Sequence, residues 1–370
     1  MMATITEMSE IETPKASDYR IIDCDIHQTI RGWKDLQPYL REPWRSRVME
    51  GGSHIGGLGY ISPAGHRRKD AYPESGGPPG SDPKLLVQQL CQDNQMDLGI
   101  LTGEIYGWNM HPHQDYANAV IAAWNDWTVE HWLAAYPHLF RGAIAINSND
   151  PEAAAAEIDR LGPRADMVMV IMGATSTAPY GQKRYYPIYE AVVRHNLPIA
   201  MHPAAAGTGI AHAVTAVGFP RTFFEYHTGL STIFQSQLIS LIAEGVFERF
   251  PTLKWIFIEG GVSWLPALMW RMDKNYKALR ADAPWVRRLP SEYIHDHCYF
   301  TTQPIEEPAQ TEWLHQIFEM IDAQNCLLYA SDYPHWDFDA RRVINRLPAH
   351  YRHKIFQENA EKLFGLNGDQ

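Results

Sequence analysis

The stretch YRIIDCDIH at residues 19–27 is an apolar run of strand length that ends in two carboxylates and a histidine at alternate positions. Seven further runs of this kind follow it. Most of the eight are nearly continuous apolar segments, as expected for parallel strands covered on both faces. The seven are MDLGILTGE (96–104), FRGAIAIN (140–147), DMVMVIMG (166–173), LPIAMHP (197–203), LKWIFIEGG (253–261), CYFTTQ (298–303) and CLLYASDYP (326–334).

Helical patterns separate these runs. Residues 150–161 read DPEAAAAEIDRL, which places Asp150 as an N-cap and Pro151 at the first helical position. Residues 185–196 and 231–250 carry apolar residues at intervals of three and four, which is typical of amphipathic helices. The chain therefore alternates strands with helices.

Eight strands with intervening helices predict a single (β/α)₈ TIM-type barrel over residues 19–370, preceded by an N-terminal tail at 1–18. An open, doubly wound sheet is the alternative. Its usual glycine-rich turn after the first strand is absent from DIHQTIRGW at 25–33. The sequence thus favours the closed barrel.

Two connections are too long for simple turns. Residues 28–95 and 204–230 are irregular insertions after the first and fifth strands, and the first is rich in glycine and proline. Long irregular insertions in a compact domain usually serve as lids or interfaces. In a barrel both would leave from the carboxyl ends of strands, where active sites lie.

Composition excludes several classes of protein. The chain has 45% apolar and 12% aromatic residues, enough to bury a substantial core, and its formal net charge is −11. This charge argues against nucleic acid or an anionic membrane as a partner. We also see no secretory signal and no apolar run that approaches the ~18 residues of a membrane span.

The cysteines point to a reducing compartment. The four of them are far apart and form no C-x-x-C pair, so they predict neither a thiolate zinc site nor a disulfide framework. We therefore expect a cytoplasmic protein. The cysteines are Cys24, Cys91, Cys298 and Cys326.

The first run ends in a pair of residues suited to metal binding. Asp25 and His27 are two positions apart on a strand, so their side chains point to the same face. A carboxylate oxygen and an imidazole nitrogen suit a divalent cation of borderline hardness. Taken alone, the pair is more often a hydrogen-bonded polar strand end.

Two more polar residues stand at strand ends. His202 closes the fifth run and Asp332 the eighth. In a closed barrel the first and eighth strands are neighbours, so Asp25, His27, His202 and Asp332 can meet around one ion. We therefore predict a divalent metal site and expect zinc, with manganese or iron, in one or two ions, as the alternative.

The motifs IDCDIH, MHP, GGVSWLP and ASDYPHWD, with the closing ENAEKLFGL at 358–366, resemble the amidohydrolase superfamily. The resemblance is to the amidohydrolase-related branch that contains aminocarboxymuconate-semialdehyde decarboxylase and the resorcylate decarboxylases. It runs from about residue 20 to 366. It implies that Asp25, His27, His202 and Asp332 are metal ligands and that His335 lies beside the metal, against a ligand or the substrate.

One position departs from that branch. Many of its decarboxylases have a catalytic histidine in an H-G-G stretch at the end of strand six, and here FIEGGVSWLP places Glu259 there. A glutamate there could act as general base on a metal-bound water, or it could ligate a metal, including a second one. Alternatively, Glu259 only hydrogen-bonds the helix that starts near Val262.

Other residues are candidates for contacts with the substrate. His227 closes the second insertion and could return to the site, or it could be a lid or interface histidine. Arg67 and Arg68 could bind a substrate carboxylate, although basic loop residues are more often solvated. His111, which follows the second strand, could line the mouth of the barrel.

These residues leave three activities open. We expect a metal-dependent hydrolase or decarboxylase (lyase) that acts on a small carboxylated substrate. One alternative is a dinuclear manganese or iron component of an O₂-dependent hydroxylase (a monooxygenase), and another is a structural metal-binding subunit paired with an active homologue. The resemblance implies a homodimer, and a hetero-oligomer with a homologous subunit is the alternative assembly.

Overall fold

Eight parallel strands form one sheet in which the order in space is the order in sequence, β1 to β8. The computed structural model describes residues 19–50, 65, 67–340 and 347–366, so the predicted tail at 1–18 lies outside them. The strands are β1 Ile22–Ile26, β2 Leu98–Leu101, β3 Phe140–Ala145, β4 Met167–Gly173, β5 Ile199–His202, β6 Trp255–Phe257, β7 Cys298–Thr301 and β8 Leu327–Leu328.

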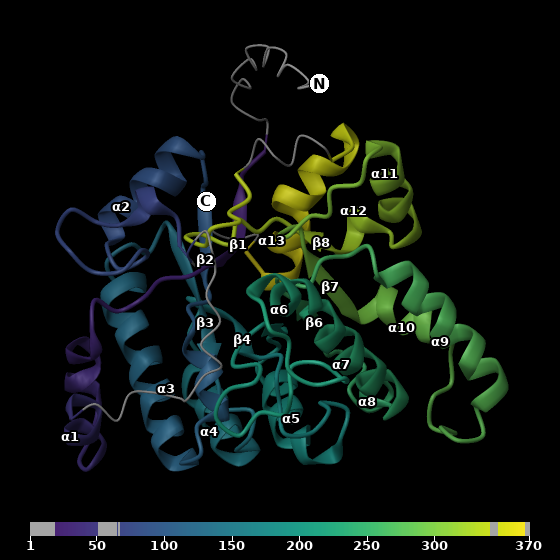
Figure 1. The fold of residues 1–370 in the computed structure, drawn as a ribbon, viewed down its shortest axis with the longest axis horizontal. Coiled ribbons are helices and arrows are strands. Elements are labelled where there is room, and N and C mark those ends of the chain that lie inside the picture. The colour runs from purple at the N-terminus through teal and green to yellow at the C-terminus, as the bar shows by residue number, and fades with distance from the viewer. Residues whose placement is uncertain (1–18, 51–64, 66, 341–346, 367–370) are drawn as a thin grey trace.

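Backbone hydrogen bonds from β1 to the chain around and after β8 close the ring (Figure 1). The amide of Cys24 donates to Tyr329 O over 2.8 Å, and that of His27 donates to Tyr333 O over 2.7 Å. Ile26 and Tyr333 also form a parallel bridge. The predicted (β/α)₈ barrel is therefore confirmed, and the open sheet is excluded.

All eight predicted strands are present, and each is shorter than its apolar run. The last is shortest, because β8 comprises only Leu327 and Leu328. Every residue of β1, β2, β4 and β5 is buried, which explains their continuous apolar character. Asp332 consequently lies in the turn beyond β8, whereas its apolar run had suggested that it lies within the strand.

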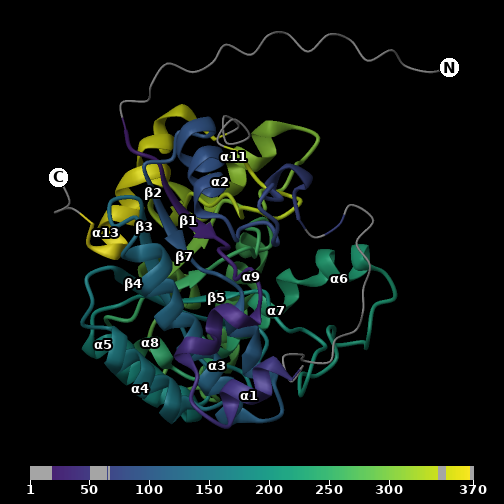
Figure 2. The ribbon, with the colours of Figure 1, turned by 90° about the vertical axis from the view of Figure 1, so that its left-hand side faces the viewer.

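Helices surround the barrel in the described part of the chain (Figures 1 and 2). They are α1 Trp44–Met49, α2 Pro83–Val87, α3 Gln114–Thr128, α4 Pro151–Leu161, α5 Tyr186–Arg194, α6 Phe223–Gly229, α7 Ser231–Ala243, α8 Val246–Arg249, α9 Leu265–Leu279, α10 Pro290–His297, α11 Thr311–Met320, α12 Ala323–Cys326 and α13 Asn359–Phe364. Short 3₁₀ or π segments occupy Trp33–Tyr39, Lys69–Ala71, Gln88–Asp93, Ile105–Met110, Val129–Leu133, Lys183–Tyr185, Ala349–Tyr351 and Lys354–Glu358.

Local signals fix where two of these helices begin or stop. Asp150 caps α4 by accepting a 3.2 Å hydrogen bond from the amide of Ala153, as predicted. The run at 231–250, predicted as one helix, is two helices. Gly245 adopts φ +74° between α7 and α8 and ends the first of them.

The two long connections leave from the carboxyl ends of β1 and β5. In its described part, 28–95 contains only short helices, and 204–230 contains α6, which stands apart from the ring of helices at the right of Figure 2. That these segments act as lids stays a prediction. Within the described ranges, no helix has both the length and the apolar character needed to cross a bilayer.

Candidate metal centre and its cavity

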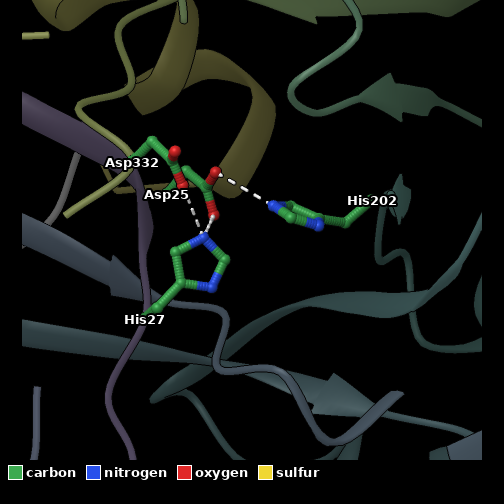
Figure 3. A group of neighbouring side chains, drawn as sticks. All are labelled: Asp25, His27, His202 and Asp332. Carbon is green, nitrogen blue, oxygen red and sulfur yellow. Dashed lines mark ion pairs between the residues drawn. The ribbon is translucent and has the colours of Figure 1, made fainter. Parts of the chain in front are cut away.

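Four side chains from three distant parts of the sequence meet at the carboxyl ends of the strands (Figure 3). Asp25 lies in β1, His27 is the first residue after β1, His202 ends β5, and Asp332 lies beyond β8. Each offers one nitrogen or oxygen atom within 4.8 Å of the others, and all four residues are buried. We call these four residues the primary cluster.

Ring and carboxylate atoms of the primary cluster face one another. His27 Nε2 lies 2.8 Å from Asp332 Oδ1 and 3.4 Å from Asp25 Oδ1. His202 Nε2 lies 3.4 Å from Asp25 Oδ2. The predicted meeting of these four side chains is thus present in the fold.

Hydrogen bonds behind the primary cluster orient both imidazoles. His27 Nδ1 lies 2.7 Å from the carbonyl oxygen of Gly103, and His202 Nδ1 lies 2.9 Å from that of Pro203. A carbonyl only accepts, so each Nδ1 carries the hydrogen and each Nε2 turns its lone pair towards the cluster. This is the arrangement that metal-ligating histidines normally have.

Three polar atoms of the primary cluster are placed to bind a cation and do not hydrogen-bond one another. Asp25 Oδ2, His27 Nε2 and His202 Nε2 are buried and have no hydrogen-bond partner among the described residues, which is costly for polar atoms. Burial opposes charge on each group. The imidazoles nevertheless hold the pKa of Asp25 below its usual range, and the Asp25 and Asp332 carboxylates raise the pKa of His27. The cluster therefore attracts positive charge, and its donors suit a divalent metal ion.

A second group of donors stands beside the first. His227 Nε2, in α6, lies 3.6 Å from Glu259 Oε1 and 3.7 Å from Asp337 Oδ2. Glu259 Oε2 lies 3.1 Å from His202 Nε2. Burial, together with the Asp332 and Glu259 carboxylates, raises the pKa of Asp337 to about 7. We call His227, Glu259 and Asp337 the Glu259 cluster.

Glu259 does not cap the helix that follows it. Instead, Glu306 accepts hydrogen bonds from the amides of Val262 and Ser263 over 3.0 and 2.9 Å. Glu259 has a left-handed backbone, φ +61°, and its amide donates to the Thr301 hydroxyl over 3.0 Å. The reading of Glu259 as a helix-binding residue is therefore wrong.

His335 joins the primary cluster to the cavity wall. Its Nδ1 contacts Asp332, and its Nε2 lies 3.1 Å from Glu104 Oε1. Although burial opposes it, the Asp332 carboxylate raises the pKa of His335 to about 9. Arg67 forms an ion pair with the same Glu104.

These groups line a cavity of about 360 Å³ at the carboxyl ends of the strands. Arg67, Glu104, His335 and the Glu259 cluster contribute to it, as does Tyr106, whose buried hydroxyl has no hydrogen-bond partner within the described part of the chain. Burial raises the pKa of Tyr106, and the Asp25, Glu104 and Glu259 carboxylates raise it further.

Two predicted substrate contacts are placed elsewhere. Arg68 pairs with Asp70 and lies 4.2 Å over the Phe338 ring, and it is not among the residues that line this cavity. His111 stacks on Trp108 and accepts a hydrogen bond from the amide of His113, also outside the lining. This placement corrects the expectation for both residues, because their local partners turn them away from the cavity.

Sequence reasoning missed three residues of the site. Glu104 closes the predicted run 96–104, so the strand-end rule that selected His202 would have found it. Asp337 stands two residues after His335 and was not assigned a role. Tyr106 carries no signal in the sequence, since a tyrosine in a short 3₁₀ helix is ordinarily core.

Two imidazoles and two carboxylates are thus buried together at the strand ends of a closed (β/α)₈ barrel. They form a four-residue metal-binding site. A family model described as amidohydrolase matches residues 22–366. The chain therefore belongs to the amidohydrolase family, and the resemblance seen in its motifs is confirmed.

The relatives carry more specific names. A gamma-resorcylate decarboxylase from Polaromonas sp. (strain JS666 / ATCC BAA-500) is 26% identical over 265 residues, which cover 68% of this chain and 78% of the relative. The barrel also matches a crystal structure of dihydroxybenzoic acid decarboxylase from Polaromonas sp. JS666, with bound manganese and the inhibitor 2-nitroresorcinol. The TM-score is 0.65 at 19% identity, covering 94% and 98% of the two chains.

A second solved relative is 5-carboxyvanillate decarboxylase from Novosphingobium aromaticivorans DSM 12444, complexed with manganese and 4-hydroxy-3-methoxy-5-nitrobenzoic acid. Its TM-score is 0.68 at 19% identity, covering 94% and 96% of the two chains. At this identity the likeness establishes the fold. Both solved relatives hold manganese, so they do not support zinc, the ion expected from the sequence.

Proposed function

We propose that this chain is a manganese-dependent decarboxylase of a small aromatic carboxylate that carries a ring hydroxyl group. The observation that carries the proposal is the primary cluster, whose His202 lines a cavity of about 360 Å³. The family and the relatives named as decarboxylases support it. Carboxylate and imidazole donors also suit manganese.

Asp25, His27, His202 and Asp332 would hold the ion. When bound, it supplies positive charge that attracts the substrate carboxylate and an adjacent oxygen and accepts electron density as CO₂ leaves. Arg67, which also lines the cavity, adds a second positive charge for an anionic substrate.

His335 is the residue best placed to supply the proton. In the reaction the bond between the ring carbon and the carboxylate breaks, CO₂ leaves, and the ring carbon takes up one proton. The Asp332 carboxylate raises the pKa of His335, which favours its protonated form, and His335 faces the cavity. Glu104, which is exposed and in contact with His335 Nε2, connects it to solvent protons.

The other activities receive less support. Hydrolysis remains chemically open because Glu259 lies beside His202 and could act as a base. The relatives are named decarboxylases, so they favour the lyase and lend no support to a hydroxylase component or a structural subunit. The homodimer, the hetero-oligomer and the cytoplasmic location all stay predictions.

The test is an assay of CO₂ release. Chelator-treated protein is reloaded with Mn(II) and incubated with 2,6-dihydroxybenzoate, with 5-carboxyvanillate and with unsubstituted benzoate. We expect CO₂ from at least one hydroxylated substrate, none from benzoate, and none from the His202→Ala variant. In D₂O the product should carry deuterium at the carbon that lost the carboxylate. If the fully loaded protein releases no CO₂ from a panel of hydroxylated benzoates, the proposal fails.

A further inference from the structure

The three side chains of the Glu259 cluster come from three separate parts of the barrel. His227 lies in α6, Glu259 follows β6 by two residues, and Asp337 lies in the segment after β8. Each offers one donor atom within 4.8 Å of the others. Two carboxylates and an imidazole brought together in this way form a donor set for a divalent cation.

The spacing of these atoms is that of ligands and not of hydrogen-bonded partners. His227 Nε2 lies 3.6 Å from Glu259 Oε1 and 3.7 Å from Asp337 Oδ2. Hydrogen bonds between nitrogen and oxygen are roughly 2.7–3.2 Å long. Two ligands that each lie about 2.1 Å from one ion are roughly 3.0–3.5 Å apart, which is close to the observed spacing.

Glu259 is shared between the two clusters. Its Oε1 is directed to His227, and its Oε2 lies 3.1 Å from His202 Nε2, a member of the primary cluster. A carboxylate with one oxygen towards each cluster can bridge two ions. In two-metal sites the ions are about 3.5–4 Å apart, a separation that a bridging carboxylate spans.

The charge of the cavity also calls for a second cation. Three carboxylates line it and two more belong to the primary cluster, whereas Arg67 is the one lysine or arginine among the described lining residues. One divalent ion and Arg67 compensate three of the five negative charges, and a protonated His335 compensates a fourth. A second divalent ion compensates the remainder. The carboxylates are Asp25, Glu104, Glu259, Asp332 and Asp337.

A buried hydroxyl supplies an independent sign that something binds here. Tyr106 is 1% exposed and lines the same cavity, and no residue that the structure describes hydrogen-bonds its hydroxyl. Leaving such a group unsatisfied is unfavourable. An ion with its own water or substrate ligands in the cavity would provide an acceptor.

We infer that His227, Glu259 and Asp337 hold a second divalent cation, with Glu259 bridging it to the ion of the primary cluster. The oxygen-rich donor set suits manganese or iron. This second site deepens the proposed function. It rests on that function only for the substrate class, because two ions would make the acidic cavity receptive to a carboxylate. It also gives Glu259 the ligand role that its position at strand six left open.

The experiment counts metal in the full-length protein. Chelator-treated chain is equilibrated with Mn(II), freed of unbound ion and analysed by plasma mass spectrometry. We expect two manganese ions per chain in the wild type and one in Glu259→Gln and in Asp337→Asn, both isosteric changes. The control is Glu312→Gln, at an exposed position in α11, which should keep two. Electron paramagnetic resonance should show an exchange-coupled pair in the wild type and isolated Mn(II) in Asp337→Asn.

One ion per wild-type chain at saturation would overturn the inference, whatever the variants do. Retention of two ions by both Glu259→Gln and Asp337→Asn would also overturn it. The Glu259 cluster would then exchange protons among its own side chains and hold no metal. The count does not depend on turnover. Release of CO₂ with a single ion would therefore support the proposed function while refuting the second site, and two ions without CO₂ release would do the reverse.

Discussion

The hydroxyl of Thr102, directly after β2, donates a hydrogen bond of 2.7 Å to Asp25 Oδ1 on the neighbouring strand. The same hydroxyl lies 3.0 Å from the carbonyl oxygen of Ile26. Thr102 is buried and has no direct place in the primary cluster. It therefore fixes the orientation of one predicted metal ligand from the adjacent strand.

We predict that Thr102→Val weakens binding of the first metal ion by about 10–100-fold, the usual cost of losing a group that orients a ligand. Valine keeps the volume and removes the donor. Titration of the metal-free protein with Mn(II) in the presence of a competing chelator measures the change. Thr177→Val, away from the primary cluster, is the control. Unchanged affinity in Thr102→Val would show that Asp25 is oriented by other contacts.

Loss of a ligand should be more severe. Asp332→Asn removes the negative charge beside His27 Nε2 and should weaken binding of the first metal ion at least about 100-fold, with activity falling in parallel. Elemental analysis after gel filtration gives the metal content. Asp322→Asn, an acid at the N-terminus of α12, serves as the control. Full metal content in Asp332→Asn would remove Asp332 from the ligand set.

His335→Gln tests the proton donor. We expect kcat for CO₂ release to fall by about 10²–10⁴, the range for loss of a general acid, while metal content stays at the wild-type value. The matched variant His138→Gln alters an exposed histidine and should retain wild-type activity. If His335→Gln keeps a tenth or more of the wild-type rate, another group delivers the proton.

Gly261 holds the backbone beside Glu259 in a conformation that only glycine adopts readily. It has φ +63°, and an added Cβ would lie 2.6 Å from Glu306 Oε1. Glu306 cannot easily withdraw, because it accepts hydrogen bonds from Val262 and Ser263. We expect Gly261→Ala to lower the free energy of unfolding by about 1–3 kcal/mol, measured by urea denaturation.

A second glycine provides the comparison for that measurement. At Gly32 an added Cβ meets nothing within 4 Å, and the backbone is extended. Gly32→Ala should therefore change stability by less than about 0.5 kcal/mol. Equal stability of the two variants would contradict the steric argument at Gly261.

His297 should make stability depend on pH. Burial lowers its pKa, and its Nδ1 lies 2.9 Å from the carbonyl oxygen of Leu253. Because the folded-state pKa lies below the unfolded value of about 6.5, the unfolded chain binds the proton first. The contribution of His297 is therefore present above about pH 6.5 and is lost as the pH falls below it.

The variant His297→Gln can still donate to Leu253 O but does not titrate. We expect its free energy of unfolding to fall less steeply than that of the wild type between about pH 6.5 and pH 5. Urea unfolding at several pH values measures both slopes, with the exposed His138→Gln as the control. Identical slopes for wild type and His297→Gln would show that His297 does not contribute.

Much of the site could be read from the sequence because its residues stand at the ends of apolar runs. Asp25, His27 and His202 follow from strand position and from the two-residue periodicity of a strand. Asp332 was found by the same rule, although it lies beyond β8. The rule worked because parallel strands in a barrel bring their carboxyl ends to one rim.

Long-range geometry limited the rest. Nothing local says that Asp337 reaches His227, 110 positions earlier, or that Glu104 contacts His335. Arg68 and His111 were expected at the substrate, but their near neighbours Asp70 and His113 engage them first. Such choices between competing partners are settled by tertiary packing.

The sequence alone determined the eight strands, the barrel and the four residues of the primary cluster, because burial and strand periodicity are written locally in the chain. Only the tertiary structure decided that Glu259 turns one oxygen to His202 and the other to His227. That placement needs the left-handed backbone at Glu259, the hydrogen bond from its amide to Thr301, and the return of α6 to the barrel. These are contacts between distant segments, so they exist only once the ring has closed.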